Sequence, residues 1–288
     1  MKCTKRLFLF AGYDSQGIVG PSLEYYVQAL ARYGDIVLTM DTDCQPGMLD
    51  RLSGKVLHAH AERHGEYDFG SYKRSYMWIS GHTGLSGYDV CYLVNDSVFG
   101  PLADIGPYLE KMESLGTDAF GLVLNPHRRH PHLQSWFIGM HRKVFLSDMF
   151  CRFISGVTAQ KDKNAVCDLY ETGLTNLFDS EGFSYDALFR VKGKKIYNAV
   201  ETLCRLGLPF IKKSAFTRHG GSLGRQIRHI LENTEDKALT SAVISDIDRL
   251  YGPGYWSRLT SCSRTGVCLR YFRYMINKLF PKKSVLFR

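Results

Sequence analysis

Residues 88–97 read YDVCYLVNDS, an apolar run that stops at Asn95, Asp96 and Ser97. A short continuous apolar run of this kind is typical of a strand buried on both faces. Similar short runs alternate with helical patterns through the first 125 residues. The expected strands are 6–10, 35–40, 55–61, 88–94 and 119–124, and the expected helices are 22–33, 71–80 and 105–115. This order predicts an α/β fold with a Rossmann-type, mostly parallel sheet flanked by helices.

The second half of the chain is expected to be mainly helical. One more strand is predicted at 133–140, followed by helices to about residue 189 and a mostly helical stretch over 191–248. We therefore expect a sheet domain at 1–190, a helical extension at 191–250 and a C-terminal segment at 251–288.

The composition is that of an ordinary globular protein. The 288 residues are 44% hydrophobic and 23% charged, and the net charge is +9. Residues 249–288 hold nine basic residues and no acidic ones, so the first 248 residues are balanced. A nucleic-acid-binding protein would carry its positive charge within the fold, so nucleic acid is not an expected partner.

The cysteines and histidines favour structural roles in a reducing compartment. Eight scattered cysteines include no CxxC pair, and the spacing of His58, His60 and His64 matches no zinc pattern closely. The apolar stretch 7–11 is shorter than a signal peptide requires, and no run is long enough to cross a bilayer. A cytoplasmic location is the expectation.

Polar residues follow several of the expected strands. In sheets of this type ligands bind beyond the carboxyl ends of the strands. The residues at those ends are Asp14, Asp41, Asp43 and Asp96. Asp41 and Asp43 are candidates for contacts with a base or ribose.

The segment from Asp68 to Arg74 carries a second signal. Asp68, Gly70 and Lys73 lie at an expected helix start, where backbone N–H groups and a cation favour an anion such as a diphosphate. The alternative is an Asp-initiated helix whose cations are simply solvated.

The polar end of the fourth strand has two interpretations. Asn95, Asp96 and Ser97 offer hard oxygen ligands for Mg²⁺ or Mn²⁺ bridging a diphosphate. The same residues also readily form an Asx turn and a helix cap. The chain has no GxGxxG, GxxxxGK[ST] or GxSxG motif. The sequence therefore does not support a dinucleotide-binding site, a P-loop or a hydrolase nucleophile elbow.

Five short segments in the same order resemble the rhamnan synthesis protein F family. They are 67–73 (YDFGSYK), 93–101 (LVNDSVFGP), 132–137 (HLQSWF), 170–175 (YETGLT) and 209–213 (PFIKK). The resemblance implies a glycosyltransferase of bacterial polysaccharide or lipopolysaccharide assembly. It further implies a nucleotide-activated rhamnose donor, dTDP-rhamnose, and a glycan or lipid-linked glycan acceptor.

The order of parts is also similar to GT-A glycosyltransferases, in which a strand ends in a DxD metal motif. By that analogy Asn95, Asp96 and Ser97 occupy the DxD place and bind the nucleotide sugar, with Asp96 as the metal ligand. One carboxylate replaces two, so Mg²⁺ or Mn²⁺ dependence stays open. Without a metal, Lys73, Arg128 or Arg129 would neutralise the leaving diphosphate.

The family segment around His132, Gln134 and Ser135 is expected on the acceptor or diphosphate side.

Glu171 is the candidate general base. It stands at an expected helix start after the sheet, similar to the acceptor-side acid of inverting GT-A enzymes. Alternatively it is a solvated first-turn glutamate, with Asp168 and Glu181 as substitutes in the catalytic role. A different class of function, a catalytically silent nucleotide-sugar-binding subunit of a membrane assembly complex, is the competing hypothesis.

The basic C-terminal segment predicts a membrane surface as partner. Cys268, Phe272, Met275 and Leu279 recur at helical spacing among the cations of 264–288. We expect peripheral binding at the inner face of the cell membrane, and the alternative is a last helix packed on the protein body.

Overall fold

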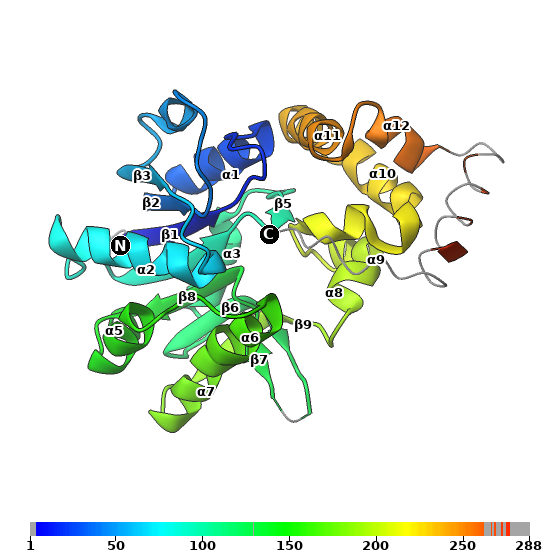
Figure 1. Ribbon diagram of the computed structural model, residues 1–288. Helices are drawn as coiled ribbons and strands as arrows, with labels where there is room; N and C mark the ends of the chain where they lie inside the picture. The colour runs from blue at the N-terminus through cyan, green and yellow to red at the C-terminus, as the bar shows by residue number, and fades with distance from the viewer. Residues whose placement is uncertain are drawn as a thin grey trace. The chain divides into compact units, whose positions relative to one another are not determined.

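The computed structural model describes residues 4–128 and 130–261, and single positions at 266, 268, 272, 275 and 276 (Figure 1). It divides into two units. The first comprises residues 1–19, 27–96 and 104–193, and the second comprises 20–26, 97–103 and 194–288. Each unit is thus assembled from separate stretches of the chain.

The first unit is built on an eight-stranded sheet in the order β3-β2-β1-β4-β8-β6-β7, with β9 paired to β6. The strands are β1 (Arg6–Gly12), β2 (Asp35–Met40), β3 (His58–Ala61), β4 (Val90–Asn95), β6 (Ala119–Asn125), β7 (His132–Leu133), β8 (Phe137–His141) and β9 (Tyr185–Arg190). Pairing is parallel from β3 to β4 and between β6 and β9, whereas β8 runs antiparallel to both β4 and β6. The expected α/β fold with a mostly parallel sheet is confirmed.

Helices cover both faces of this sheet. They are α1 (Pro21–Ala31), which extends into the second unit, and α2 (Tyr67–Gly81), α3 (Gly106–Glu113), α4 (Arg142–Phe145), α5 (Asp148–Ser155), α6 (Lys163–Val166) and α7 (Gly173–Ser180). A π-helical segment, Cys167–Thr172, joins α6 to α7, and a 3₁₀ turn spans Leu49–Leu52.

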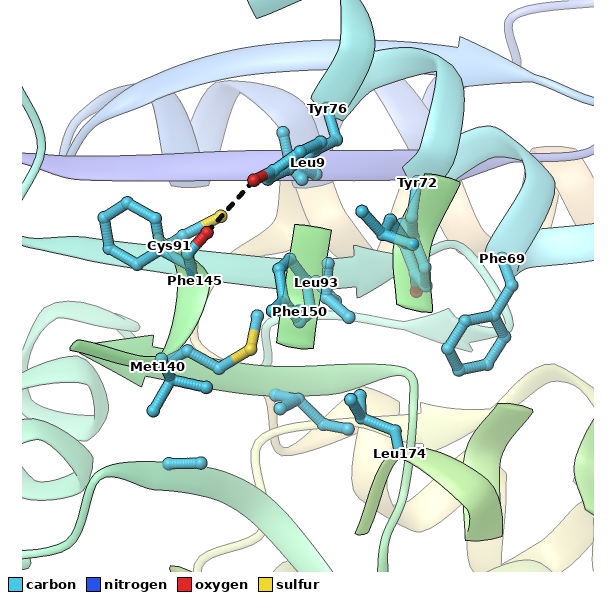
Figure 2. Close-up of a cluster of buried hydrophobic side chains, with 14 of the residues drawn as sticks. Leu9, Phe69, Tyr72, Tyr76, Cys91, Leu93, Met140, Phe145, Phe150 and Leu174 are labelled. Carbon is cyan, nitrogen blue, oxygen red and sulfur yellow. Dashed lines mark hydrogen bonds between the residues drawn. The ribbon is translucent and has the colours of Figure 1, made fainter. Parts of the chain in front are cut away.

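The largest core lies on the face of the sheet covered by α2, α5 and α7 (Figure 2). Leu9 of β1 and Leu93 of β4 point into it, together with Tyr72 and Tyr76 of α2. Alternate residues of a strand point to opposite faces. Tyr92 accordingly lies on the other face, where its hydroxyl donates to Glu113 of α3 at 2.7 Å.

The second unit contains a two-stranded sheet and a set of helices with their own core. The elements are β5 (Val98–Phe99), β10 (Ile211–Lys212), α8 (Lys195–Asn198), α9 (Val200–Arg205), α10 (Gly224–Glu232), α11 (Lys237–Tyr251) and α12 (Tyr255–Thr260), with 3₁₀ turns at Lys213–Phe216 and Arg218–Gly221. Phe99 packs with Phe216 and Leu231 in its core. The buried carboxylate of Asp246 accepts hydrogen bonds from the N–H (2.8 Å) and hydroxyl of Ser22, which ties residues 20–26 to α11.

Two sequence expectations are wrong. Residues 133–140 form two strands instead of one, because Gln134, Ser135 and Trp136 leave the sheet between β7 and β8. Residues 185–190 form strand β9, where helix was expected. The strand is only half-buried, and the polar Asp186 and Arg190 interrupt the apolar pattern by which a strand is recognised. It is held as a strand by parallel pairing with β6.

Candidate active site

Strand β4 delivers Asn95 and Asp96 to the carboxyl edge of the sheet. Their backbone N–H groups donate to the carbonyls of Trp136 and Ala11, each at 3.2 Å, so the chain is fixed at both residues. The side-chain amide of Asn95 donates to the carboxylate of Asp68 at 2.8 Å. Asn95 is 1% exposed and Asp96 9% exposed, so both lie at a largely buried point at the end of β4.

The entry to α2 is shaped by Asp41. Its carboxylate accepts the N–H groups of His64 (3.0 Å), Gly65 (2.8 Å) and Tyr67 (3.2 Å). Tyr67 has φ +58°, a left-handed conformation that costs free energy for a residue with a Cβ and is often found at functional sites. Asp41 therefore stabilises the turn that positions Asp68.

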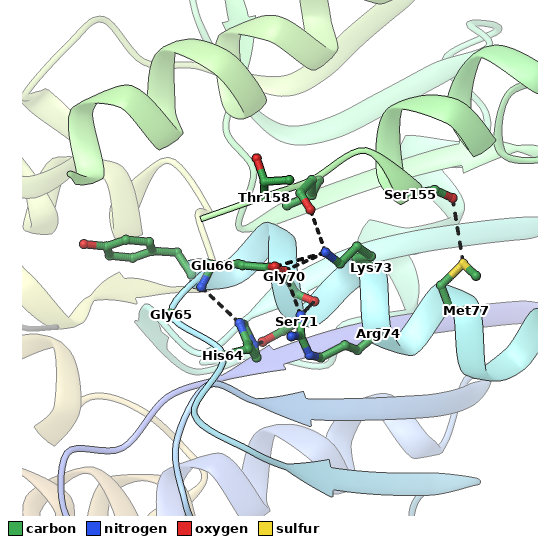
Figure 3. Close-up of polar contacts among 12 residues, drawn as sticks. His64, Gly65, Glu66, Gly70, Ser71, Lys73, Arg74, Met77, Ser155 and Thr158 are labelled. Carbon is green, nitrogen blue, oxygen red and sulfur yellow. Dashed lines mark hydrogen bonds and ion pairs between the residues drawn. The ribbon is translucent and has the colours of Figure 1, made fainter. Parts of the chain in front are cut away.

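The cations of α2 are paired within the chain (Figure 3). Lys73 Nζ donates to Glu66 at 3.1 Å and to the carbonyl of Val157 at 2.6 Å. Arg74 binds the same glutamate at 2.7 Å. A Cβ on Gly70 would overlap the side chain of Glu66, so this glycine makes room for the ion-pair network. Contacts of Lys73 and Gly70 with a ligand stay predictions.

Glu171 lies on the π-helical segment, a form of helix that occurs frequently at functional sites. One of its oxygens, Oε1, accepts both the N–H of Ser135 (2.8 Å) and the hydroxyl of Ser135 (3.1 Å). The carbonyl of Ser135 in turn accepts the hydroxyl of Tyr72 at 3.0 Å. Tyr72 lies one helical turn after Asp68, so α2 contacts both the Asn95 end and the Glu171 end of the site.

The Cys167 thiol is strongly perturbed. Burial, together with the negative charges of Glu171 and Asp68, raises the pKa of this thiol to about 12 against the opposing charge of Lys163. Cys167 is therefore a neutral thiol in the physiological range and not a nucleophile.

The other predicted residues are spread over the chain. Asp43 is exposed and accepts the N–H of Arg63 at 3.0 Å. Buried Gln134 accepts the indole N–H of Trp136 at 2.7 Å. His132 pairs with the carbonyl of His130.

The remaining five candidates are Ser97, Arg128, Arg129, Asp168 and Glu181. Ser97 belongs to the second unit, where its hydroxyl accepts from Lys212 Nζ at 2.9 Å. Arg128 is exposed on the β6–β7 hairpin, and Arg129 lies outside the described residues. Asp168 and Glu181 are both exposed.

The donor set for a metal ion is small. Within residues 4–128, 130–261 and the few described later positions, no three His, Cys, Asp or Glu side chains group together as metal ligands. Asp96 is the predicted ligand, and its neighbour Asp68 is engaged by the Asn95 amide. Mg²⁺ or Mn²⁺ would need most of its ligands from a bound diphosphate and water.

The sequence reasoning missed two residues of this site, Tyr72 and Cys167. Tyr72 is four residues after Asp68, so helical spacing alone places both on one side of α2. Cys167 is likewise four residues before Glu171, but the π-helix alters the side-chain directions there, and no pattern signals it.

The site and the sheet define an α/β protein in which Asn95, at the end of the buried strand β4, is bonded to Asp68 of α2. Residues 45–255 match the family model of rhamnan synthesis protein F, and the chain belongs to this family. No curated protein matches the sequence significantly. A solved cytidylyltransferase from Leptospira borgpetersenii serovar Hardjo-bovis is similar with a TM-score of 0.36 and 10% identity, over 81% of this chain and 99% of that one.

Proposed function

We propose that this protein is an inverting GT-A-like glycosyltransferase of rhamnan synthesis. It would transfer a sugar, rhamnose by family, from a nucleoside diphosphate to a glycan or lipid-linked glycan acceptor. The observation that carries the proposal is the hydrogen bond between Asn95 and Asp68 at the start of α2. Glu171 is connected to the same helix through Ser135, whose carbonyl accepts from Tyr72. Family membership supplies the class of product.

The chemistry is a single displacement. The acceptor hydroxyl oxygen forms a bond to the anomeric carbon while the bond from that carbon to the diphosphate oxygen breaks, and the leaving diphosphate keeps the electron pair. The hydroxyl proton passes to the carboxylate of Glu171, which acts as general base. Because Oε1 is bound by Ser135, Oε2 is the oxygen that takes the proton.

The donor side is assigned to Asp68, Asn95 and Asp96, with Asp41 and Asp43 towards the base and ribose. A divalent cation, if bound, would neutralise charge on the diphosphate, and Asp96 is the residue proposed to hold it. His132 and Gln134 are proposed for the acceptor or diphosphate side.

The competing function is a nucleotide-sugar-binding subunit without catalysis. The single carboxylate at the end of β4 favours it, because two carboxylates would hold a metal better. Glu171 opposes it, because a pure binding subunit has no need of a positioned carboxylate on the far side of the site.

Donor binding and transfer separate the two functions. A thermal-shift screen with nucleotide sugars including dTDP-rhamnose should identify the donor, since a ligand at 100 times its Kd stabilises by about 2.7 kcal/mol. A transfer assay to a lipid-linked acceptor then measures turnover. Asp96→Ala should abolish transfer and weaken the thermal shift, while Asp50→Ala at an exposed site should change neither. Donor binding without transfer by the unmodified protein would favour the silent subunit.

The proposed place of action is the inner face of the cell membrane. Among the described residues, no helix is both long and apolar enough to span a bilayer. The segment 264–288 lies mostly outside the described residues, but Phe272 is 64% exposed and Cys268 is also exposed. Exposed apolar side chains among the seven cations of this segment support docking to an anionic surface.

A further inference from the structure

The contact between Ser135 and Glu171 fixes the orientation of the glutamate side chain. Two donors of one residue, the backbone N–H at 2.8 Å and the hydroxyl at 3.1 Å, converge on the same oxygen of the carboxylate. A glutamate side chain has several rotatable bonds, and two bonds from one residue hold it in one orientation. The second oxygen receives neither of these bonds.

Regular strand pairing is interrupted at this contact. Strand β7 ends at Leu133 and β8 begins at Phe137, so the N–H of Ser135 is released from the ladder and points to Glu171. On either side, Gln134 N–H donates to Val123 at 2.9 Å and Trp136 accepts from Asn95 at 3.2 Å. The interruption is therefore fixed at both ends and is not a loose loop.

Ser135 is also connected to the donor side. Its carbonyl accepts the hydroxyl of Tyr72 at 3.0 Å, and Tyr72 is fully buried on α2 one turn after Asp68. Ser135 itself is 9% exposed. A continuous set of bonds thus runs from Asp68 through α2 and Ser135 to Glu171.

We propose that Ser135 is a positioning residue that orients Glu171, with Tyr72 holding Ser135 in place. This inference rests on the proposed function, in which Glu171 is the general base. Ser135 would thus act on the reaction through Glu171 and not on the sugar.

The test is the steady-state kinetics of transfer by Ser135→Ala, which keeps the N–H bond and removes the hydroxyl bond. We expect kcat to fall roughly tenfold, the effect of losing one hydrogen bond to a charged group. KM for the donor should stay unchanged, and Ser135→Thr should restore kcat. Tyr72→Phe should give a smaller change in the same direction.

Ser184→Ala is the matched control. Ser184 donates its N–H and its hydroxyl to one oxygen of Asp118, both at 3.0 Å, in the same unit of the protein. Loss of this equivalent contact should leave kcat of transfer unchanged. A fall of equal size in Ser184→Ala would show a general effect of stability and would overturn the role of Ser135.

The outcomes distinguish this inference from the proposed function. If the unmodified protein transfers sugar and Glu171→Gln lowers turnover, an unchanged kcat in Ser135→Ala overturns the positioning role alone. If Glu171→Gln retains full turnover, or if the unmodified protein binds donor without transferring it, the base role fails and this inference fails with it. A lowered kcat with an unchanged KM supports both.

Discussion

The amide of Asn95 donates a 2.8 Å hydrogen bond to the carboxylate of Asp68, across the gap between the end of β4 and the start of α2. In a DxD-type arrangement the position of Asn95 would hold a carboxylate. Here a neutral amide faces Asp68 and satisfies it without a cation. The pair therefore places a neutral amide opposite Asp68 where that arrangement would place a second carboxylate.

Asn95→Asp should destabilise the protein at neutral pH. The new carboxylate would face Asp68 directly in a buried place, and two like charges there cost on the order of 1–3 kcal/mol relative to the lost hydrogen bond. We expect a lower Tm at pH 7 by differential scanning fluorimetry and partial recovery on addition of Mg²⁺. Asn176→Asp on the exposed face of α7 is the control and should leave the Tm nearly unchanged. A variant as stable as the parent without Mg²⁺ would show that Asp68 does not need the amide.

His64 should make the stability of the α2 entry depend on pH. Its Nδ1 accepts the N–H of Glu66 at 3.1 Å, so the ring proton is on Nε2, which donates to Ser71 at 3.0 Å (Figure 3). Burial lowers the pKa of His64, and Arg74 lowers it further, against the opposing charges of Asp41, Glu66 and Glu62.

The sign follows from proton linkage. The unfolded chain binds a proton near pH 6.5 and the folded protein only at lower pH, so the free energy of unfolding is highest above that value and falls as the pH drops through and below it. His64→Asn, whose side-chain oxygen can accept the same N–H, should have a flatter profile of Tm between pH 7 and pH 5. His130→Asn, at an exposed position, should keep the slope of the parent. Parallel slopes for all three proteins would remove His64 as the cause.

Gly139 should not tolerate a side chain. It lies in the middle of β8, where an added Cβ would overlap the ring of Phe120 and lie 2.7 Å from Cε1 of Tyr92. Gly139→Ala is expected to lower the free energy of unfolding by about 1–3 kcal/mol, the usual cost of overpacking a core. Gly87→Ala, with no described atom within 4 Å of the new Cβ, should stay within about 0.5 kcal/mol of the parent. Urea denaturation measures both, and equal stability of the two variants would contradict the packing argument.

The C-terminal segment should bind the protein to anionic membranes. Each cation near such a surface contributes about 1 kcal/mol, so the nine basic residues from Arg249 onward should give binding that salt reverses. Full-length protein should sediment with phosphatidylserine-containing liposomes at low salt and be released at high salt. A chain ending at Ser263 and the full-length variant Lys282→Glu/Lys283→Glu should sediment less. Unfolding of the truncated chain would instead assign the segment to the protein core.

The sequence was most informative where one element is regular by itself. Strand β2 has the predicted bounds, and β1, β4 and α2 appear within a few residues of theirs, because their apolar periods are set by the chain locally. The strand end at Asn95 and the helix start at Asp68 could each be recognised from local pattern.

What the sequence could not show are relationships between distant residues. The stretch LQSWFIGM reads as one strand, and only the bond from Ser135 to Glu171, 36 residues later, explains why it is interrupted. Strand β9 is likewise defined by pairing with β6 and not by its own weak pattern. The partners of Lys73 and Asp41 also depend on tertiary contacts, which a linear pattern does not contain.

The bond from Ser22 to Asp246 has a consequence for how the chain is made. Residues 20–26 leave the ribosome early, but the carboxylate and helices that complete their unit are translated more than 200 residues later. All residues of the first unit have been translated soon after β9. The partners of Ser22 and of the apolar Phe99 are translated later, in the last third of the chain. At 5–20 residues per second, this delay is roughly 10–50 seconds. Premature termination after the sheet would thus yield a fragment with exposed apolar surface, a natural substrate for chaperones and proteases.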